Sequence, residues 1–325
     1  MTGDEVDILM ATYNGGRYIA QQLATVQKQS LSGWRLLVSD DCSSDDTTDI
    51  VHEYAASDPN IVIVGEGVRR GGAKENFAYL MGCSSAPYVA FSDQDDVWLP
   101  NKLERLVGAM HELETRAGAA MPLLIFSDAK VVDENLNIIS ESFAKFSRLD
   151  PRRHSFAQLL AQNVAPGFLM LANRTLIELA TPTILAPEVS MHDWWLMLCA
   201  ASFGLIGYVN EPLALYRQHG DNAIGAQAFS MSERVSHMSR MDERFAKTLL
   251  QATAFRDSYA GRLCDRDLAT VTEYVAIIEG HPLGNVAHLF HSGCWKSGTR
   301  KMGQILSAIR RGMRHDSDLW DCEGR

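Results

Sequence analysis

Short apolar segments, rich in β-branched and aromatic residues, alternate with helix-length segments over the N-terminal part of the chain. The apolar segments span residues 6–11, 34–39, 61–64, 88–91 and 123–126, a length and composition typical of buried parallel strands. The segments between them span 17–29, 46–56, 74–83 and 101–114 and predict helices. This alternation predicts an α/β fold, in which helices cover both faces of a mostly parallel sheet.

Composition limits the class of protein. The chain has 325 residues, 46% of them hydrophobic and 22% charged, as expected for one large or two modest folded domains. Its formal net charge of -10 argues against a nucleic-acid partner, because the phosphates would be repelled. The 6 cysteines show no metal-ligand spacing, and the first residues lack the basic-then-apolar order of a signal peptide. We therefore expect a cytosolic protein with reduced thiols.

One uncharged segment, residues 194–209, is near the lower length limit for a membrane span. It contains two glycines and is closely flanked by Asp193 and Glu211. These features favour a buried helix that ends near Gly204 and is followed by a short strand over 205–209.

The first four predicted strands are each followed by a polar loop rich in glycine or acidic residues. The loops cover residues 11–16, 39–46, 65–72 and 93–96. Ligands bind at the carboxyl ends of the strands in α/β sheets, so we expect these loops to converge on one site. No single loop is specific, since such segments are also ordinary turns and helix caps; their convergence is what predicts a site.

The loop after the fourth strand contains three carboxylates, those of Asp93, Asp95 and Asp96. Like charges this close raise each other's pKa unless a cation lies among them. Hard divalent cations such as Mg²⁺ or Mn²⁺ bind carboxylate oxygens and keep open positions for substrate phosphates. The cluster therefore predicts a metal–diphosphate site, although taken alone it also fits a solvated turn that caps the next helix.

Three of these motifs resemble the nucleotide-sugar half of family 2 inverting glycosyltransferases with the GT-A fold. They are ILMATYNG at 8–15, VSDDCSSD at 38–45 and DQDD at 93–96. Further motifs are similar to bacterial rhamnosyltransferases of surface polysaccharide (O-antigen) assembly: DQDDVWLP at 93–100, NVAPG at 163–167, HDWW at 192–195 and YRQHGDN at 216–222. The resemblance implies a GT-A domain over residues 1–225, and the remainder, 226–325, reads as a helical C-terminal region.

The resemblance implies that a dTDP- or UDP-linked sugar donor contacts Thr12, Tyr13, Asn14, Asp41, Arg70, Lys74, Asn76, Asp93 and Gln94. Asp41 resembles the carboxylate that accepts the base N3–H, a charge-assisted hydrogen bond, while its neighbour Asp40 is a structural alternative. The family usually has glycine where this chain has Cys42, so we expect a less tight turn. Asp96 is expected either to cap the helix that begins near Pro100 or to touch the ligand.

The resemblance also implies the catalytic groups. Asp93, Asp95 and His219 are the expected contacts to a Mg²⁺ or Mn²⁺ ion, with diphosphate contact as the alternative for His219. Asp193 is the candidate general base that removes the proton of the acceptor hydroxyl, although aspartate at a helix start is also a routine cap. His192, Trp194 and Trp195 are the expected acceptor or sugar pocket, with one or both tryptophans as alternative core residues. Gly220 and Gly225 are expected to let the following loop close over the donor.

The C-terminal region changes character. Residues 230–254 and 256–278 predict helices without a recognisable site. Residues 296–314 contain 6 basic residues and no acidic ones, interleaved with apolar residues. Two interpretations are open: a patch for anionic lipid headgroups, which would suit a lipid-linked acceptor, or a surface helix with a solvated basic face.

These expectations favour a metal-dependent inverting glycosyltransferase that moves L-rhamnose from dTDP-rhamnose to a glycan or lipid-linked acceptor. We expect it at the cytoplasmic face of a bacterial membrane, with peripheral membrane contact. The first alternative is a UDP-hexose-dependent enzyme of the same fold. The others are a nucleotidyltransferase, which lacks support because the first loop is not a glycine-rich basic loop, and a non-catalytic nucleotide-sugar-binding module. A processive synthase is disfavoured because its Gln-x-x-Arg-Trp motif is absent.

Overall fold

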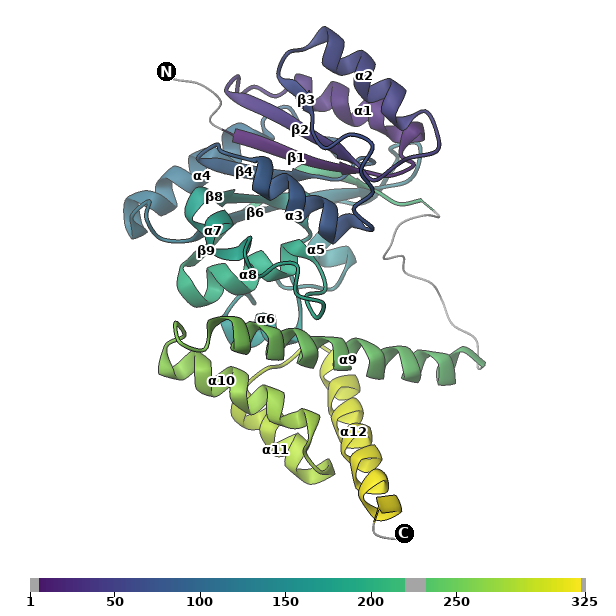
Figure 1. Cartoon of the computed structure of the whole chain (residues 1–325), viewed down its shortest axis with the longest axis vertical. Helices are drawn as coiled ribbons and strands as arrows, with labels where there is room; N and C mark the ends of the chain where they lie inside the picture. Colours follow the sequence, from purple (N-terminus) through teal and green to yellow (C-terminus); the bar gives the residue numbers. More distant parts are fainter. Residues whose placement is uncertain (1–5, 220–231, 323–325) are drawn as a thin grey trace. The chain divides into compact units, whose positions relative to one another are not determined.

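The computed structural model describes residues 6–219 and 232–322, with side chains described up to residue 219 and from 240 to 313. The chain divides into two compact units (Figure 1). The first comprises Met1–Arg152, Ala165–Leu185 and Met191–Ala223, and the second comprises Arg153–Val164, Ala186–Ser190 and Ile224–Arg325. Two short segments from within residues 1–225 therefore belong to the second unit.

The first unit contains a mixed sheet in which the strands follow the order β3-β2-β1-β4-β8-β6-β9-β5, with β7 paired to β6. The strands are β1 Val6–Thr12, β2 Trp34–Asp40, β3 Ile61–Ile63, β4 Tyr88–Ser92, β5 Val97–Trp98, β6 Leu123–Val132, β7 Ile138–Ser140, β8 Met170–Asn173 and β9 Leu205–Arg217. β3, β2, β1 and β4 are mutually parallel, and β6 pairs in parallel with β9. The carboxyl ends of the first four strands therefore share one edge, as predicted.

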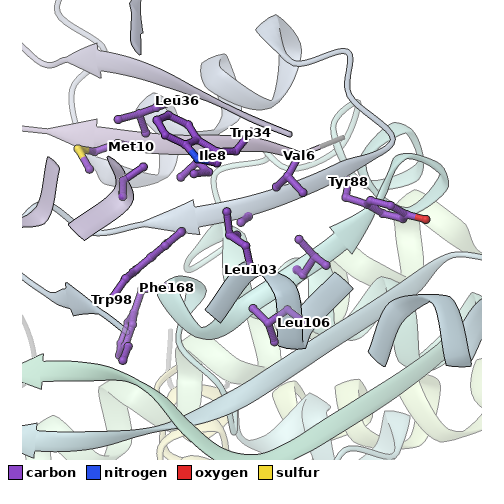
Figure 2. Packing of buried hydrophobic residues seen from close by; sticks show 14 of the residues in the cluster. Val6, Ile8, Met10, Trp34, Leu36, Tyr88, Trp98, Leu103, Leu106 and Phe168 are labelled. Carbon is purple, nitrogen blue, oxygen red and sulfur yellow. The ribbon is translucent and has the colours of Figure 1, made fainter. Parts of the chain in front are cut away.

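Helices cover both faces of this sheet (Figure 1). They are α1 Gly16–Gln27, α2 Thr47–Ser57, α3 Ala73–Cys83, α4 Lys102–Ala117, α5 Phe143–Phe146, α7 Arg174–Ala180 and α8 His192–Phe203, with the 3-10 turn η1 Gly167–Leu169. Alternate residues of β1 pack with apolar residues of α1 and α4 in one core layer (Figure 2). This layer includes Ile8, Leu23 and Leu106, all fully buried. Side chains alternate between the two faces of a strand and recur about every 3.6 residues on one face of a helix. The apolar residues of β1, α1 and α4 can therefore all point into the same layer.

The sequence did not predict the antiparallel strand β8, which lies between β4 and β6. Its residues are few and wholly buried, so they show no alternation. The short strand predicted over 205–209 continues to Arg217 as one strand, β9, whose register with β6 shifts near Asp128.

The uncharged segment 194–209 forms a buried helix, α8, and the start of β9, as predicted. The helix ends where a side chain on Gly204 would lie 1.6 Å from the carbonyl oxygen of Pro122. Within the described residues, no helix is both long and apolar enough to cross a bilayer.

The second unit is helical. It contains α6 Phe156–Ala161, α9 Ser232–Tyr259, α10 Asp265–Val275, the 3-10 turn η2 Ala276–Ile278, α11 Pro282–Ser292 and α12 Arg300–Cys322. The helix break predicted at residue 255 is wrong, because Phe255 is fully buried and α9 continues to Tyr259.

Leu106→Ala is expected to lower the free energy of unfolding by about 2–5 kcal/mol. Leu106 is fully buried between α4 and the sheet, so its removal combines lost burial with a cavity. Chemical denaturation followed by tryptophan fluorescence measures the change. Leu185→Ala is the control, because that side chain is 58% exposed and should change stability by less than about 0.5 kcal/mol.

Candidate functional site

Hydrogen bonds tie the four loops together at the carboxyl edge of the sheet. Gln94 joins the first and fourth loops, because its side chain accepts from Tyr13 N (2.9 Å) and donates to Tyr13 O (2.9 Å). Asn14 joins the first and second loops: its Oδ1 accepts from Ser44 N (2.8 Å). Asp41 joins the second and third loops by accepting from the backbone of Arg70 and Gly71. The predicted convergence is therefore built from specific contacts.

The two neighbouring aspartates of the second loop, Asp40 and Asp41, make different hydrogen bonds. Asp40 accepts from Thr12 Oγ1 (2.7 Å), Ser43 N (2.7 Å) and Ser43 Oγ (2.6 Å), so it fixes the turn. Asp41 is the one whose carboxylate meets the third loop. The looser turn expected at Cys42 is wrong: Cys42 has φ 62°, so it takes the left-handed conformation that glycine adopts without steric cost.

The residues of the third loop and α3 that were predicted to contact the sugar donor lie in different environments. The Arg70 guanidinium stacks on the Tyr79 ring, 3.5 Å from its centroid, so its backbone N–H rather than its charge meets Asp41. Lys74 Nζ lies 3.3 Å from Glu75 Oε1. Asn76 is 1% exposed and donates to Ser39 O (2.7 Å). The donor contact predicted for Asn76 is therefore wrong, because its amide is used inside the fold to hold the end of β2.

The carboxylates after β4 separate into accessible and buried members. Asp93 and Asp95 are partly exposed, whereas Asp96 is buried. Burial, followed by the charges of Asp95 and Asp193, raises the pKa of Asp93 to about 7. Asp95 Oδ2 lies 2.8 Å from His219 Nε2, which brings together two of the residues predicted to bind a metal.

Asp96 neither caps a helix nor faces the open edge. Its Oδ1 accepts from Arg217 N (3.2 Å), and α4 begins at Lys102 without a side-chain cap. Burial, with the charges of Asp95 and Asp93, raises its pKa well above the usual value. Both roles expected for Asp96 are therefore wrong: it joins the carboxylate loop to the end of β9.

Two basic residues for which the sequence predicted no role, Arg217 and Lys102, influence the carboxylate loop. Arg217, at the end of β9, donates to Asp95 O (2.9 Å) and Glu134 O (2.7 Å). Lys102 is fully buried and donates to Phe168 O. Burial lowers the pKa of Lys102 to about 7, against the charges of Asp96 and Asp93. Both contacts join residues distant in sequence, so no local pattern indicates them.

Asp193 lies in the first turn of α8, the position that the sequence predicted. Its Oδ2 accepts from Gly167 N (3.2 Å), and burial raises its pKa to about 6. A side chain on Gly167 would lie 2.6 Å from His192 Nε2, so the glycine of the NVAPG motif lets this turn approach α8 closely. The charge of Asp193 is one of the causes that raise the pKa of Asp93, after burial and the charge of Asp95.

Two of the three residues predicted to line an acceptor pocket are core residues. His192 is 2% exposed and packs against Phe77, with ring centroids 4.0 Å apart; burial lowers its pKa to about 3, so it is neutral. Trp195 is fully buried and donates to Thr183 Oγ1 (3.0 Å). The core alternative for Trp195 is therefore confirmed, while the pocket role of His192 is wrong, because α8 turns both side chains inward. Trp194 is partly exposed.

The chemistry of the accessible donors fits a hard divalent cation. Among the described residues, no three His, Cys, Asp or Glu side chains are arranged as a complete metal site. Mg²⁺, however, is commonly held by one or two carboxylates, with substrate phosphates and water in the other positions. Asp95 and His219 supply two adjacent donors, and Asp93 adds a carboxylate whose raised pKa a cation would lower.

Comparison with solved structures identifies the class of fold. The chain matches S. aureus TarS 1-349 in complex with UDP-GlcNAc with a TM-score of 0.55 and 13% identity, over 97% of this chain and 92% of that chain. At this identity the likeness shows the fold alone, and it is the GT-A fold. The sequence matches the family described as "Glycosyl transferase family 2" over residues 7–175. The chain therefore belongs to glycosyl transferase family 2.

Two proteins similar to this chain are named for the transfer of different sugars. The chain is 31% identical to a dTDP-rhamnosyl transferase, RfbG, of Shigella flexneri over 67% of this chain and 74% of that protein. It is 29% identical to a UDP-Glc:alpha-D-GlcNAc-diphosphoundecaprenol beta-1,3-glucosyltransferase, WfgD, of Escherichia coli over 63% of this chain and 73% of that protein.

Proposed function

We propose that this glycosyltransferase moves L-rhamnose from dTDP-rhamnose to a glycan or lipid-linked acceptor during polysaccharide biosynthesis, with inversion at the anomeric carbon. The observation that carries the proposal is the convergence of the four loops at one edge of the sheet, where Asp95 Oδ2 lies 2.8 Å from His219 Nε2. The charge of Asp193 contributes to the raised pKa of Asp93, which supports a base candidate near this cation-binding candidate. The similarity to RfbG supports the choice of rhamnose.

In this proposal Asp193 accepts the proton of the acceptor hydroxyl, and the backbone N–H of Gly167 orients its carboxylate. Asp95, Asp93 and His219 would hold a divalent cation, which would supply charge neutralisation at the departing diphosphate. Asp41, Thr12, Tyr13 and Asn14 belong to the loops that receive the nucleotide. Residues 1–225 carry this chemistry, and residues 226–325 serve the acceptor side at the cytoplasmic face of the membrane.

A donor screen tests the choice of sugar. Calorimetry with Mn²⁺ present compares dTDP-rhamnose with dTDP-glucose, UDP-glucose and UDP-GlcNAc at equal concentrations. We expect dTDP-rhamnose to bind at least about tenfold more tightly, a difference of about 1.4 kcal/mol. Tighter binding of a UDP-hexose would instead support the second candidate, a UDP-hexose-dependent enzyme, which the similarity to WfgD favours.

The rate of transfer is expected to fall in acid. The pKa of Asp193 is raised to about 6, so the base is protonated below that pH and free above it. At saturating cation and donor, kcat should fall about tenfold for each pH unit well below 6 and level off between 7 and 8. A rate that stays constant from pH 5 to pH 8 would contradict the assignment of Asp193 as the base.

A further inference from the structure

In the second unit, α11 and α12 pack together through small and polar residues. Asn285 is fully buried and its Nδ2 donates to Ala308 O (3.0 Å). Ser307 is 2% exposed and Ala308 is fully buried. A side chain on Gly312 would lie 2.4 Å from Pro282 N, so this glycine lets α12 approach the first turn of α11 (Figure 1). The two helices therefore use little of their apolar surface to contact each other.

Several large apolar side chains of both helices are nevertheless exposed, whereas Leu289 on α11 is fully buried. On α11, Leu283 is 80% exposed and Phe290 is 64% exposed. On α12, Met302, Leu306 and Met313 are 63%, 45% and 57% exposed. The spacings of seven residues on α11, and of four and seven on α12, place each set along one helical stripe. A helix that only packs on its own domain shows the opposite arrangement, with its apolar stripe inward.

Aromatic contacts connect the two stripes. The Phe290 ring meets the Trp295 ring at a centroid distance of 5.0 Å, and Lys301 Nζ lies 5.9 Å from the centroid of Trp295. Met302 follows Lys301 directly on α12. We call the exposed apolar residues of the two helices, together with the partly exposed Trp295 between them, the α11–α12 surface: Leu283, Phe290, Trp295, Met302, Leu306 and Met313. Contiguous exposed apolar surface of this kind marks a site of interaction with a partner or membrane.

The charge around this surface indicates which partner it fits. Residues 280–314 contain no aspartate or glutamate, although the chain as a whole has a formal net charge of -10. Arg310 pairs with Asp242 (2.6 Å) and Arg311 donates to Ile278 O (3.3 Å), so these two serve the fold. Arg300 and Lys301 are exposed beside the apolar stripe. A second copy would present the same positive charge, whereas an anionic surface complements it.

We propose that the α11–α12 surface binds an anionic membrane surface. Its apolar side chains enter the boundary between headgroups and acyl chains, and Arg300 and Lys301 lie at the level of the anionic headgroups. The polar residues between the helices stay within the protein. This refines the basic-stretch expectation: apolar contact provides the binding, and the exposed cations Arg300 and Lys301 assist it. The proposal rests on the surface and does not depend on which sugar is transferred.

Flotation of the full chain with vesicles of 30% phosphatidylglycerol in phosphatidylcholine tests this proposal. The triple variant Phe290→Ser, Met302→Ser, Leu306→Ser should lower the bound fraction at least about tenfold. The double variant Arg300→Ala, Lys301→Ala should lower the bound fraction several-fold on these vesicles, by about fivefold at most for each residue. On vesicles of pure phosphatidylcholine the same variant should change the bound fraction little. Leu250→Ser is the matched control, because Leu250 is 45% exposed on α9 of the same unit and should bind like the wild type.

Two further measurements separate the possible failures. Calorimetric donor binding should be the same in the triple variant and the wild type, which shows that the fold and the donor site are intact. Equal vesicle binding by the triple variant and the wild type would overturn the proposal. A stable wild-type dimer in light scattering that the triple variant dissociates would also overturn it, because the surface would then bind a second copy.

Discussion

Replacing Asp193 by asparagine is expected to lower kcat by about 10²- to 10⁴-fold while leaving donor affinity unchanged. The amide has the same shape and can still accept from Gly167 N, but it cannot take a proton from the acceptor hydroxyl. Burial raises the pKa of Asp193 to about 6. The ionised carboxylate therefore lowers the free energy of unfolding at pH 7.5. The variant should therefore melt at the same temperature as the wild type or higher, which separates lost chemistry from lost folding.

The measurement for Asp193→Asn is single-turnover transfer of labelled sugar, together with calorimetric donor binding. Asp49→Asn is the control, because Asp49 is an exposed carboxylate in the first turn of α2, outside the four loops. A rate for Asp193→Asn within threefold of the control would show that Asp193 is a helix-cap residue. Loss of both donor binding and turnover would show that it positions the donor.

Replacing Asp95 by asparagine is expected to lower kcat/KM roughly 10³-fold, because a bound cation supplies several kcal/mol of charge stabilisation at the leaving group. The substitution removes the carboxylate next to His219 Nε2 but leaves the Asp95 backbone carbonyl that accepts from Arg217. The carboxylate loop should therefore keep its place.

Rates of Asp95→Asn measured across a Mn²⁺ series give the decisive comparison. The variant should need a much higher Mn²⁺ concentration for half-maximal rate than the Asp49→Asn control. An unchanged Mn²⁺ dependence with a lower rate would assign Asp95 to sugar contact instead of metal binding.

Local sequence patterns were sufficient to predict the parallel strands and the loop edge. β1, β2 and β4 are apolar runs that each end at a polar residue. The change from apolar to polar residues therefore predicts where each strand ends and its loop begins. The contacts of Gln94, Asn14 and Asp41 then join loops whose convergence the parallel order required.

The errors share one physical origin, which is that a short motif does not show which side of an element faces the core. His192 and Trp195 flank Asp193 in one motif, yet α8 turns both into the interior and leaves Trp194 partly exposed. Asn76 is buried by the same effect on α3. The roles of Lys102 and Arg217 could not be predicted, although Arg217 lies in the YRQHGDN motif, because their contacts join α4 and β9 to segments distant in sequence.

Calorimetric titration of dTDP-rhamnose into the wild type and the Asp95→Asn variant, each with Mn²⁺ and each with EDTA, tests the central claim most directly. That claim is a cation held by the carboxylates after β4 against the donor diphosphate. We expect the wild type to bind at least about tenfold more tightly with Mn²⁺ than with EDTA, and the variant to bind equally weakly in both. Wild-type binding of equal strength in Mn²⁺ and in EDTA would contradict it.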